Sequence, residues 1–154
     1  MEPAVSATAI ADFADALSRV VRLGGLPRFA EHVAARAGIH LDRSAYVLLA
    51  SLVAQQPSRI GELAELLSLD VSTVSRQVHA LEEAGLARRE PLPADRRGSL
   101  LVATEAGAVA VAAQRHARRE LFAQLLADTP DEELETVARL LHRLADRLET
   151  MPGG

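Results

Sequence analysis

The sequence predicts a mainly helical protein with one short β-hairpin. Two observations predict the helices: alanine and leucine number 29 and 24 among 154 residues, and apolar residues recur at helical spacing along most of the chain. A third predicts the hairpin, because two short segments, residues 86–90 and 99–103, flank a polar loop rich in proline and arginine at residues 91–98. With 49% apolar and 25% charged residues, the chain has the composition of an ordinary folded domain.

The first third of the chain predicts three helices. Apolar residues at helical spacing indicate one over residues 8–23, which the Gly24-Gly25 pair interrupts. A second is expected over residues 27–37. Asp42 can cap a third helix, in which the apolar run 46–53 is so continuous that we expect it at the centre of the core.

The middle of the chain predicts a helix-turn-helix unit. Apolar spacing indicates a short helix over residues 59–67 and a second over residues 71–83, joined by a turn of three residues. Asp70 is placed to cap the second helix, and Gly85 follows it at the position that favours glycine.

The two faces of the second helix differ sharply. At about 100° per residue, Val71, Val74, Val78 and Leu81 share one arc and are expected to be buried. Arg76 lies opposite this arc, on a face that has no acid before residue 82. A solvated helix face can have this composition by chance, but small hydroxyl residues beside an arginine also suit insertion into a major groove. The polar residues of this helix are Ser72, Thr73, Ser75, Arg76, Gln77 and His79.

The hairpin predicts a positively charged wing. We expect strands over residues 86–90 and 99–103 with a loop at 91–98, and residues 86–97 contain four arginines against two acids. A loop of this kind beside a recognition helix can enter the minor groove or bind phosphates. The order of helix-turn-helix, small-residue face and basic hairpin predicts a winged helix-turn-helix that binds DNA.

The terminal helices predict a homodimer. Thr104 can cap a long helix over residues 105–127, and a last helix has leucines at coiled-coil-like spacing between Leu134 and Leu148. One winged-helix lobe cannot cover the apolar stripes of both the first and the last helix, and exposed stripes of that size are rare on monomers. Packing of these helices on each other within one chain is the alternative.

Five segments resemble the MarR family of transcriptional regulators. They are residues 62–64 (ELA), 70–78 (DVSTVSRQV), 81–86 (LEEAGL), 95–98 (DRRG) and 104–107 (TEAG). The resemblance extends over about residues 8–150. It implies a helical dimerisation region at residues 1–41 and 108–154, and a DNA-binding region at residues 42–107. It further implies a homodimer on a palindromic operator, usually as a repressor, and release of DNA by a small aromatic effector.

The resemblance also assigns roles to single residues. Arg97 is implied to enter the minor groove, and Asp95 to pair with Arg96 and so stabilise the wing. Ser58 and Arg59, at a helix start, are implied to contact phosphate. The candidate DNA-binding residues are Ser58, Arg59, Ser72, Thr73, Ser75, Arg76, Gln77, His79, Arg96 and Arg97.

Other classes of protein find little support in the sequence. There is no cysteine, the five histidines show no metal-ligand spacing, and neither a nucleophile elbow nor a glycine-rich phosphate loop is present, so we expect no enzyme, cofactor or metal. No apolar run approaches about 18 residues, which predicts a cytoplasmic protein. The net charge of -4 leaves open a dimeric winged helix that binds protein instead of DNA. Phe13, Phe29 and Tyr46 could line an effector cavity, or could simply belong to the core.

Overall fold

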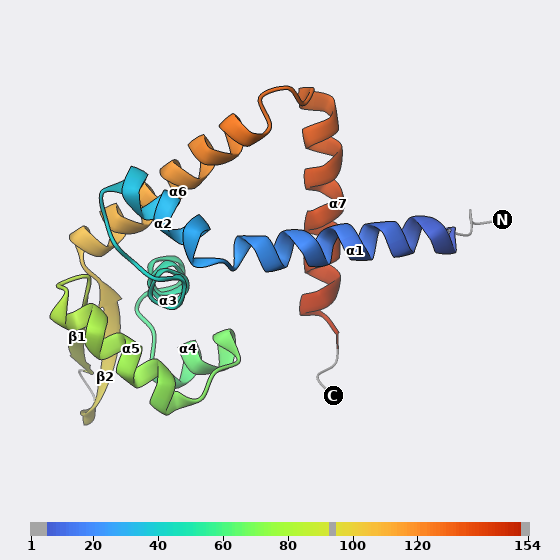
Figure 1. The fold of residues 1–154 in the computed structure, drawn as a ribbon. Helices are drawn as coiled ribbons and strands as arrows, with labels where there is room; N and C mark the ends of the chain where they lie inside the picture. Colours follow the sequence, from blue (N-terminus) through green and yellow to red (C-terminus); the bar gives the residue numbers. More distant parts are fainter. Residues whose placement is uncertain (1–5, 93–94, 152–154) are drawn as a thin grey trace. The chain divides into compact units, whose positions relative to one another are not determined.

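The computed structural model describes residues 6–92 and 95–151, without the side chains of residues 92 and 95–98. In these residues the chain forms a mainly helical fold with one antiparallel hairpin, as predicted (Figure 1). The elements are α1 (Ala7–Gly24), α2 (Pro27–Ala37), α3 (Arg43–Gln55), α4 (Ile60–Leu67), α5 (Val71–Glu83), β1 (Ala87–Leu92), β2 (Asp95–Ala103), α6 (Glu105–Leu125) and α7 (Asp131–Glu149).

The chain divides into two compact units, Met1–Arg119 and Glu120–Gly154. The division falls within α6. The first unit contains α1 to α5, the hairpin and most of α6, and the second contains the end of α6 together with α7.

The core of the first unit lies around α3. Helix α3 packs against α4, α5 and β2, and Leu48 and Leu49 are both fully buried. The prediction that the helix containing the run 46–53 is central to the core is therefore confirmed. The other large side chains that are fully buried are Val33, Leu52, Leu63, Val74, Val78, Leu81, Leu101 and Val111.

Two predicted core residues are exposed. Val47, in the expected central run of α3, is 39% exposed. The expectation that Val71 is buried is wrong, because its side chain is 56% exposed. It is the first residue of α5, at the edge of the apolar arc, where the helix begins and the core does not reach. Val74, Val78 and Leu81, further along the same arc, are buried as predicted.

The predicted helix ends are confirmed by their local bonding. The Asp42 side chain accepts a hydrogen bond from the Ala45 N–H at 2.8 Å, and the Asp70 side chain accepts one from the Thr73 N–H at 2.8 Å. Each therefore satisfies a backbone donor that its helix leaves unpaired. Gly85 has a φ of 69°, in the left-handed region that glycine adopts without strain, and the chain turns there from α5 into the hairpin.

The hairpin is longer than predicted. The strands pair from Ala87 opposite Ala103 to Pro91 opposite Ser99, with a register shift before Leu92. The expected loop at residues 91–98 is therefore wrong at both ends, while residues 93–94 lie outside the described residues. A short bridge between Ser58 and Leu101 borders the other side of β2, so β1 is an edge strand. An edge strand tolerates proline, which explains why Pro91 does not end it.

Thr104 and Gly107 join the end of the hairpin to α6 and to the turn after α5. The Thr104 hydroxyl donates to the Gly85 carbonyl at 2.7 Å and accepts from the Gly107 N–H at 3.0 Å. The Thr104 N–H donates to the Leu86 carbonyl at 3.0 Å. A Cβ at residue 107 would lie 2.1 Å from the Leu86 oxygen, so only glycine fits there. The sequence thus needs a threonine at residue 104 for these hydrogen bonds and a glycine at residue 107 for the close approach.

The terminal helices α1 and α7 are amphipathic and bury none of their own residues in the described chain. Within residues 6–92 and 95–151, no helix is long and apolar enough to span a membrane. The large apolar side chains exposed on α1 and α7 are Ile10, Val20, Val21, Leu23, Val137, Leu140, Leu141 and Leu148.

We predict that Gly107→Ala lowers the free energy of unfolding by about 3 kcal/mol, because the added methyl group would overlap the Leu86 carbonyl. Gly61→Ala is the matched control: a Cβ at Gly61 meets no atom within 4 Å, and alanine in a helix favours folding by about 0.5–1 kcal/mol. Denaturant unfolding of both variants measures the difference. Equal stabilities would contradict the close approach at residue 107.

Candidate nucleic-acid interface

The polar face of α5 is the first part of the candidate interface. Ser72, Arg76 and His79 are exposed, whereas Thr73, Ser75 and Gln77 are half-buried. The Gln77 Oε1 atom is fully buried, with no hydrogen-bond partner among the described residues. The structure thus places three of the six predicted α5 residues fully on the surface and turns the Gln77 oxygen away from it.

A hydrogen-bond network surrounds Asp70 at the start of α5. The Ser72 hydroxyl donates to Asp70 Oδ1, and the Thr73 hydroxyl donates to Oδ2 at 2.6 Å. Together with the bond from the Thr73 N–H, these bonds hold the pKa of Asp70 well below its usual range, with Ser72 the largest cause. The carboxylate is therefore ionised at neutral pH. Arg76 Nη2 in turn donates to Thr73 Oγ1 at 3.4 Å.

The far end of the face is less free of acids than the sequence suggested. His79 Nε2 lies 3.6 Å from Glu83 Oε1, one turn further along, and both side chains are 70% exposed. The Glu83 carboxylate therefore lies beside the imidazole at this end of the face.

Acidic partners occupy two of the four hairpin arginines. Arg89 Nε donates to both carboxylate oxygens of Glu82, at 3.1 and 3.2 Å, and thereby ties β1 to α5. Arg88 Nη1 lies 2.6 Å from Glu90 Oε1 on the same strand. The backbone of residues 95–97 belongs to β2, but their side chains lie outside the described residues. The roles expected for Asp95, Arg96 and Arg97 therefore stay predictions.

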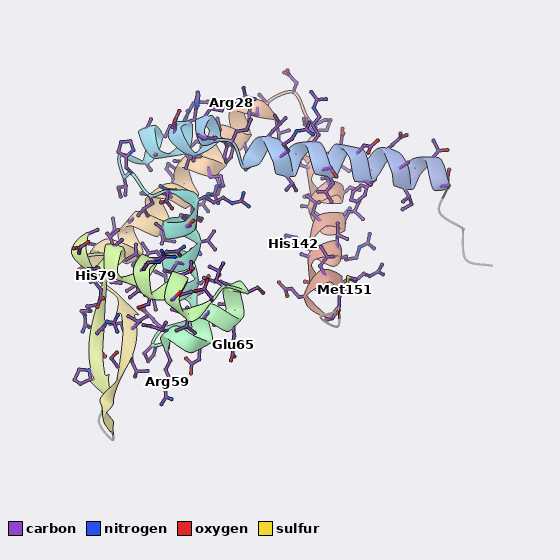
Figure 2. The ribbon with its side chains drawn as sticks, turned by 60° about the horizontal axis from the view of Figure 1, so that its bottom comes forward. Arg28, Arg59, Glu65, His79, His142 and Met151 are labelled. Carbon is purple, nitrogen blue, oxygen red and sulfur yellow. The ribbon has the colours of Figure 1, made fainter. Side chains whose placement is uncertain are left out.

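The two residues before α4 differ from each other. Ser58 is only 3% exposed, and its hydroxyl donates to the Gln55 carbonyl at 2.5 Å. A phosphate contact by the Ser58 side chain is therefore wrong, because that group bonds the backbone inside the fold. Arg59 is exposed and projects outward from the start of α4 (Figure 2). The backbone N–H of Arg59 donates to Glu62 Oε2 at 2.7 Å, so Glu62 helps to cap the start of α4.

Gln56 anchors the base of the hairpin, a role the sequence analysis missed. Its Oε1 accepts a hydrogen bond from the Ala103 N–H at 2.8 Å, across 47 residues of sequence. The adjacent bridge between Ser58 and Leu101 contributes two backbone hydrogen bonds. The Ser58 N–H donates to the Leu101 carbonyl at 3.0 Å, and the Leu101 N–H donates to the Ser58 carbonyl at 2.8 Å. Nothing in the sequence around a glutamine at a helix end indicates that it bonds a residue so far along the chain.

A groove of about 410 Å³ lies among α3, α4 and the first unit's part of α6. Its lining residues include Tyr46, Leu66 and Arg115. The Arg118 guanidinium lies 4.5 Å from the centre of the Tyr46 ring, within cation–π distance. Of the three aromatic residues considered from the sequence, Tyr46 is at this groove, whereas Phe13 and Phe29 are not among its lining residues.

The helix-turn-helix, the polar face of α5 and the attached hairpin define a winged helix-turn-helix protein. The model of the MarR family matches residues 41–99. The uncharacterized HTH-type transcriptional regulator YxaD of Bacillus subtilis (strain 168) is 40% identical over 105 residues, which are 68% of this chain and 73% of the relative. The chain belongs to the MarR family, whose members are DNA-binding transcriptional regulators and not enzymes.

Solved structures share the fold. A MarR family protein from Bacillus stearothermophilus has a TM-score of 0.79 at 20% identity, covering 96% of this chain and all of that one (100%). Staphylococcus aureus MarR, in complex with salicylate and kanamycin, has a TM-score of 0.77 at 16% identity, covering 95% of this chain and 96% of its own.

We predict that Ser58→Ala destabilises the fold without weakening DNA binding. Loss of the buried hydroxyl removes its hydrogen bond to the Gln55 carbonyl at the end of α3, at a cost of about 1–2 kcal/mol. Ser44→Ala, at an exposed serine of α3, should change stability by less than about 0.5 kcal/mol. Thermal unfolding and DNA titration test both variants, and a DNA affinity reduced for Ser58→Ala alone would restore Ser58 to the interface.

Proposed function

We propose that the protein binds a palindromic DNA operator as a homodimer and represses transcription. Helix α5 enters the major groove, and the tip of the hairpin enters the adjacent minor groove. The observation that supports this most strongly is the outward face of α5, on which Ser72, Arg76 and His79 are exposed beside a hairpin tied to the same helix through Arg89 and Glu82.

Arg76 is proposed to recognise guanine. Its planar guanidinium can donate to both O6 and N7 of that base, the commonest base-specific contact in the major groove. The bond to Thr73 limits its conformational freedom before DNA is bound. Arg59 is proposed to contact a phosphate, and Arg97 to enter the minor groove.

A second copy of the chain is proposed to cover the terminal helices. The apolar faces of α1 and α7 include Val20 at 65% exposed and Leu148 at 58%, and faces of this kind are rarely left in water. We assign dimerisation to residues 1–41 and 108–154, and DNA binding to residues 42–107. Two-fold symmetry then places the two half-sites roughly 10 bp apart, centre to centre.

An aromatic carboxylate is proposed as the effector that releases DNA. The groove at Tyr46 has a mostly apolar lining, and Arg115 in that lining offers a cation for an acid group. The salicylate complex of the Staphylococcus aureus protein supports this class of ligand. Salicylate titrated into the complex with DNA should lower its anisotropy, and Arg115→Ala should weaken that response; no effect of salicylate up to millimolar concentration would contradict this choice of ligand.

We predict that Arg76→Ala weakens binding to the operator by about 1–3 kcal/mol and relaxes the preference for guanine at one position in each half-site. Arg97→Ala should weaken binding to all sequences alike and lower its dependence on salt. Arg28→Ala, which removes the same charge from an exposed site on α2, is the control. Fluorescence anisotropy at two salt concentrations, with operator and scrambled duplexes, measures all three.

Wild-type affinity and specificity in both Arg76→Ala and Arg97→Ala would overturn this placement of the contacts. Equal weak binding of the wild-type protein to operator and scrambled DNA would instead favour a protein partner, as the net charge of -4 allows.

We predict that Leu141→Asp converts the dimer into a monomer, because a carboxylate on the apolar face of α7 would be buried against the second copy. Thr136→Asp is the control, since the new carboxylate can accept the hydrogen bond that Arg139 now gives to Thr136. Sedimentation should give twice the 16.5 kDa chain mass for the wild type and the control. A monomeric wild type would refute the dimer.

A further inference from the structure

We propose that Ser72 recognises the amino group of an adenine or cytosine, and that Asp70 determines this choice by holding the Ser72 hydroxyl as a hydrogen-bond acceptor. The proposal rests on the proposed function, in which α5 lies in the major groove. It adds a specificity-determining residue to Arg76 and a positioning residue, Asp70, that touches no base.

The first step is the direction of the hydroxyl hydrogen. A serine hydroxyl has one hydrogen to donate and two lone pairs to accept. In Ser72 that hydrogen is donated to Asp70 Oδ1. An ionised carboxylate can only accept, and the same network keeps the pKa of Asp70 low, so the bond does not reverse at neutral pH. The exposed side of Ser72 Oγ therefore presents lone pairs.

The Thr73 hydroxyl also donates its hydrogen to Asp70, but its oxygen already accepts a hydrogen bond from Arg76. Its hydroxyl hydrogen goes to Asp70 Oδ2 at 2.6 Å, and one of its lone pairs accepts from Arg76 Nη2 at 3.4 Å. Thr73 is also half-buried, whereas Ser72 is exposed. Ser72 is thus the hydroxyl that can meet a base, and Thr73 orients Arg76.

The second step is the position of Ser72 relative to Arg76. The two residues are four apart and so lie on the same side of α5, about 6 Å apart along its axis. Base pairs stack about 3.4 Å apart, so this separation corresponds to one or two base-pair steps. The acceptor of Ser72 and the donors of Arg76 therefore face neighbouring positions of one half-site.

The third step is what an acceptor distinguishes. In the major groove, adenine and cytosine present an amino group, whereas guanine and thymine present a carbonyl oxygen. A free serine hydroxyl can bond either kind, because it turns to donate or to accept. A hydroxyl fixed by Asp70 can bond only the amino group. Since every base pair has one amino and one carbonyl group, the resulting preference is for adenine or cytosine on one particular strand.

The experiment is a binding-site selection from a randomised duplex library with the full-length protein and three variants. Ser72→Ala removes the acceptor. Asp70→Ser keeps a side chain that caps α5, but its shorter hydroxyl does not reach Ser72, which is then free to turn. Asp70→Asn removes the same charge yet keeps an oxygen for the Thr73 N–H and the Ser72 hydroxyl, and is the matched control. Thermal unfolding of each variant reports on folding.

We expect the wild type to prefer adenine or cytosine over guanine or thymine by about three- to tenfold at one position, one or two steps from the guanine bound by Arg76. Asp70→Asn should retain this ratio, while Ser72→Ala and Asp70→Ser should reduce it to less than twofold. Both Asp70 variants should bind all duplexes more tightly, because a negative charge near the phosphates is lost. The guanine preference should persist in every variant.

Three outcomes would overturn the inference: an unselective wild type at that position, a wild-type ratio in Ser72→Ala or Asp70→Ser, or loss of the ratio in Asp70→Asn. In each of these cases a persisting guanine preference leaves the proposed function standing. A wild type that enriches no sequence at all refutes the proposed function, and this inference with it.

Discussion

Burial of one side of α5 is the constraint on which the rest of the structure depends. Val74, Val78 and Leu81 are almost fully buried, and α5 packs against α3, α4 and β1. Because an α-helix is rigid, fixing these three side chains also fixes the direction of every side chain on the opposite face. The position of Arg76 at the surface is thus a result of core packing, and the network around Asp70 only refines it.

The elements were well predicted from the sequence because their signals are local. Asp42, Asp70 and Gly85 lie where the backbone needs a cap or a left-handed turn, and apolar spacing located the helices between them. The core position of α3 followed from a nearly continuous apolar run, which is untypical of an exposed helix. The family motif at residues 104–107 has an equally local meaning, a close approach that excludes a Cβ.

Predictions about single surface residues were less accurate, because exposure depends on distant partners. Ser58 has a sequence typical of a helix start, yet its pairing with Leu101 in β2 buries it. Val71 belongs to the apolar arc of α5 but precedes the part of the helix that is packed. The Asp70 network needed side-chain geometry, since a capping aspartate in a sequence does not show which hydroxyls donate to it. Likewise, no local pattern pairs Gln56 with Ala103.

The two attachments of the hairpin have a mechanical consequence. Its base is bonded to the segment between α3 and α4 through Gln56 and Ser58, and Arg89 on β1 is bonded to Glu82 on α5. The hairpin therefore cannot tilt without stretching bonds to both sides, so that helix and hairpin move together as a single body. In the proposed dimer, two such bodies would adapt to DNA by changing the separation between them. Altered operator spacing should then be tolerated better than DNA distortions that require the hairpin to move relative to α5.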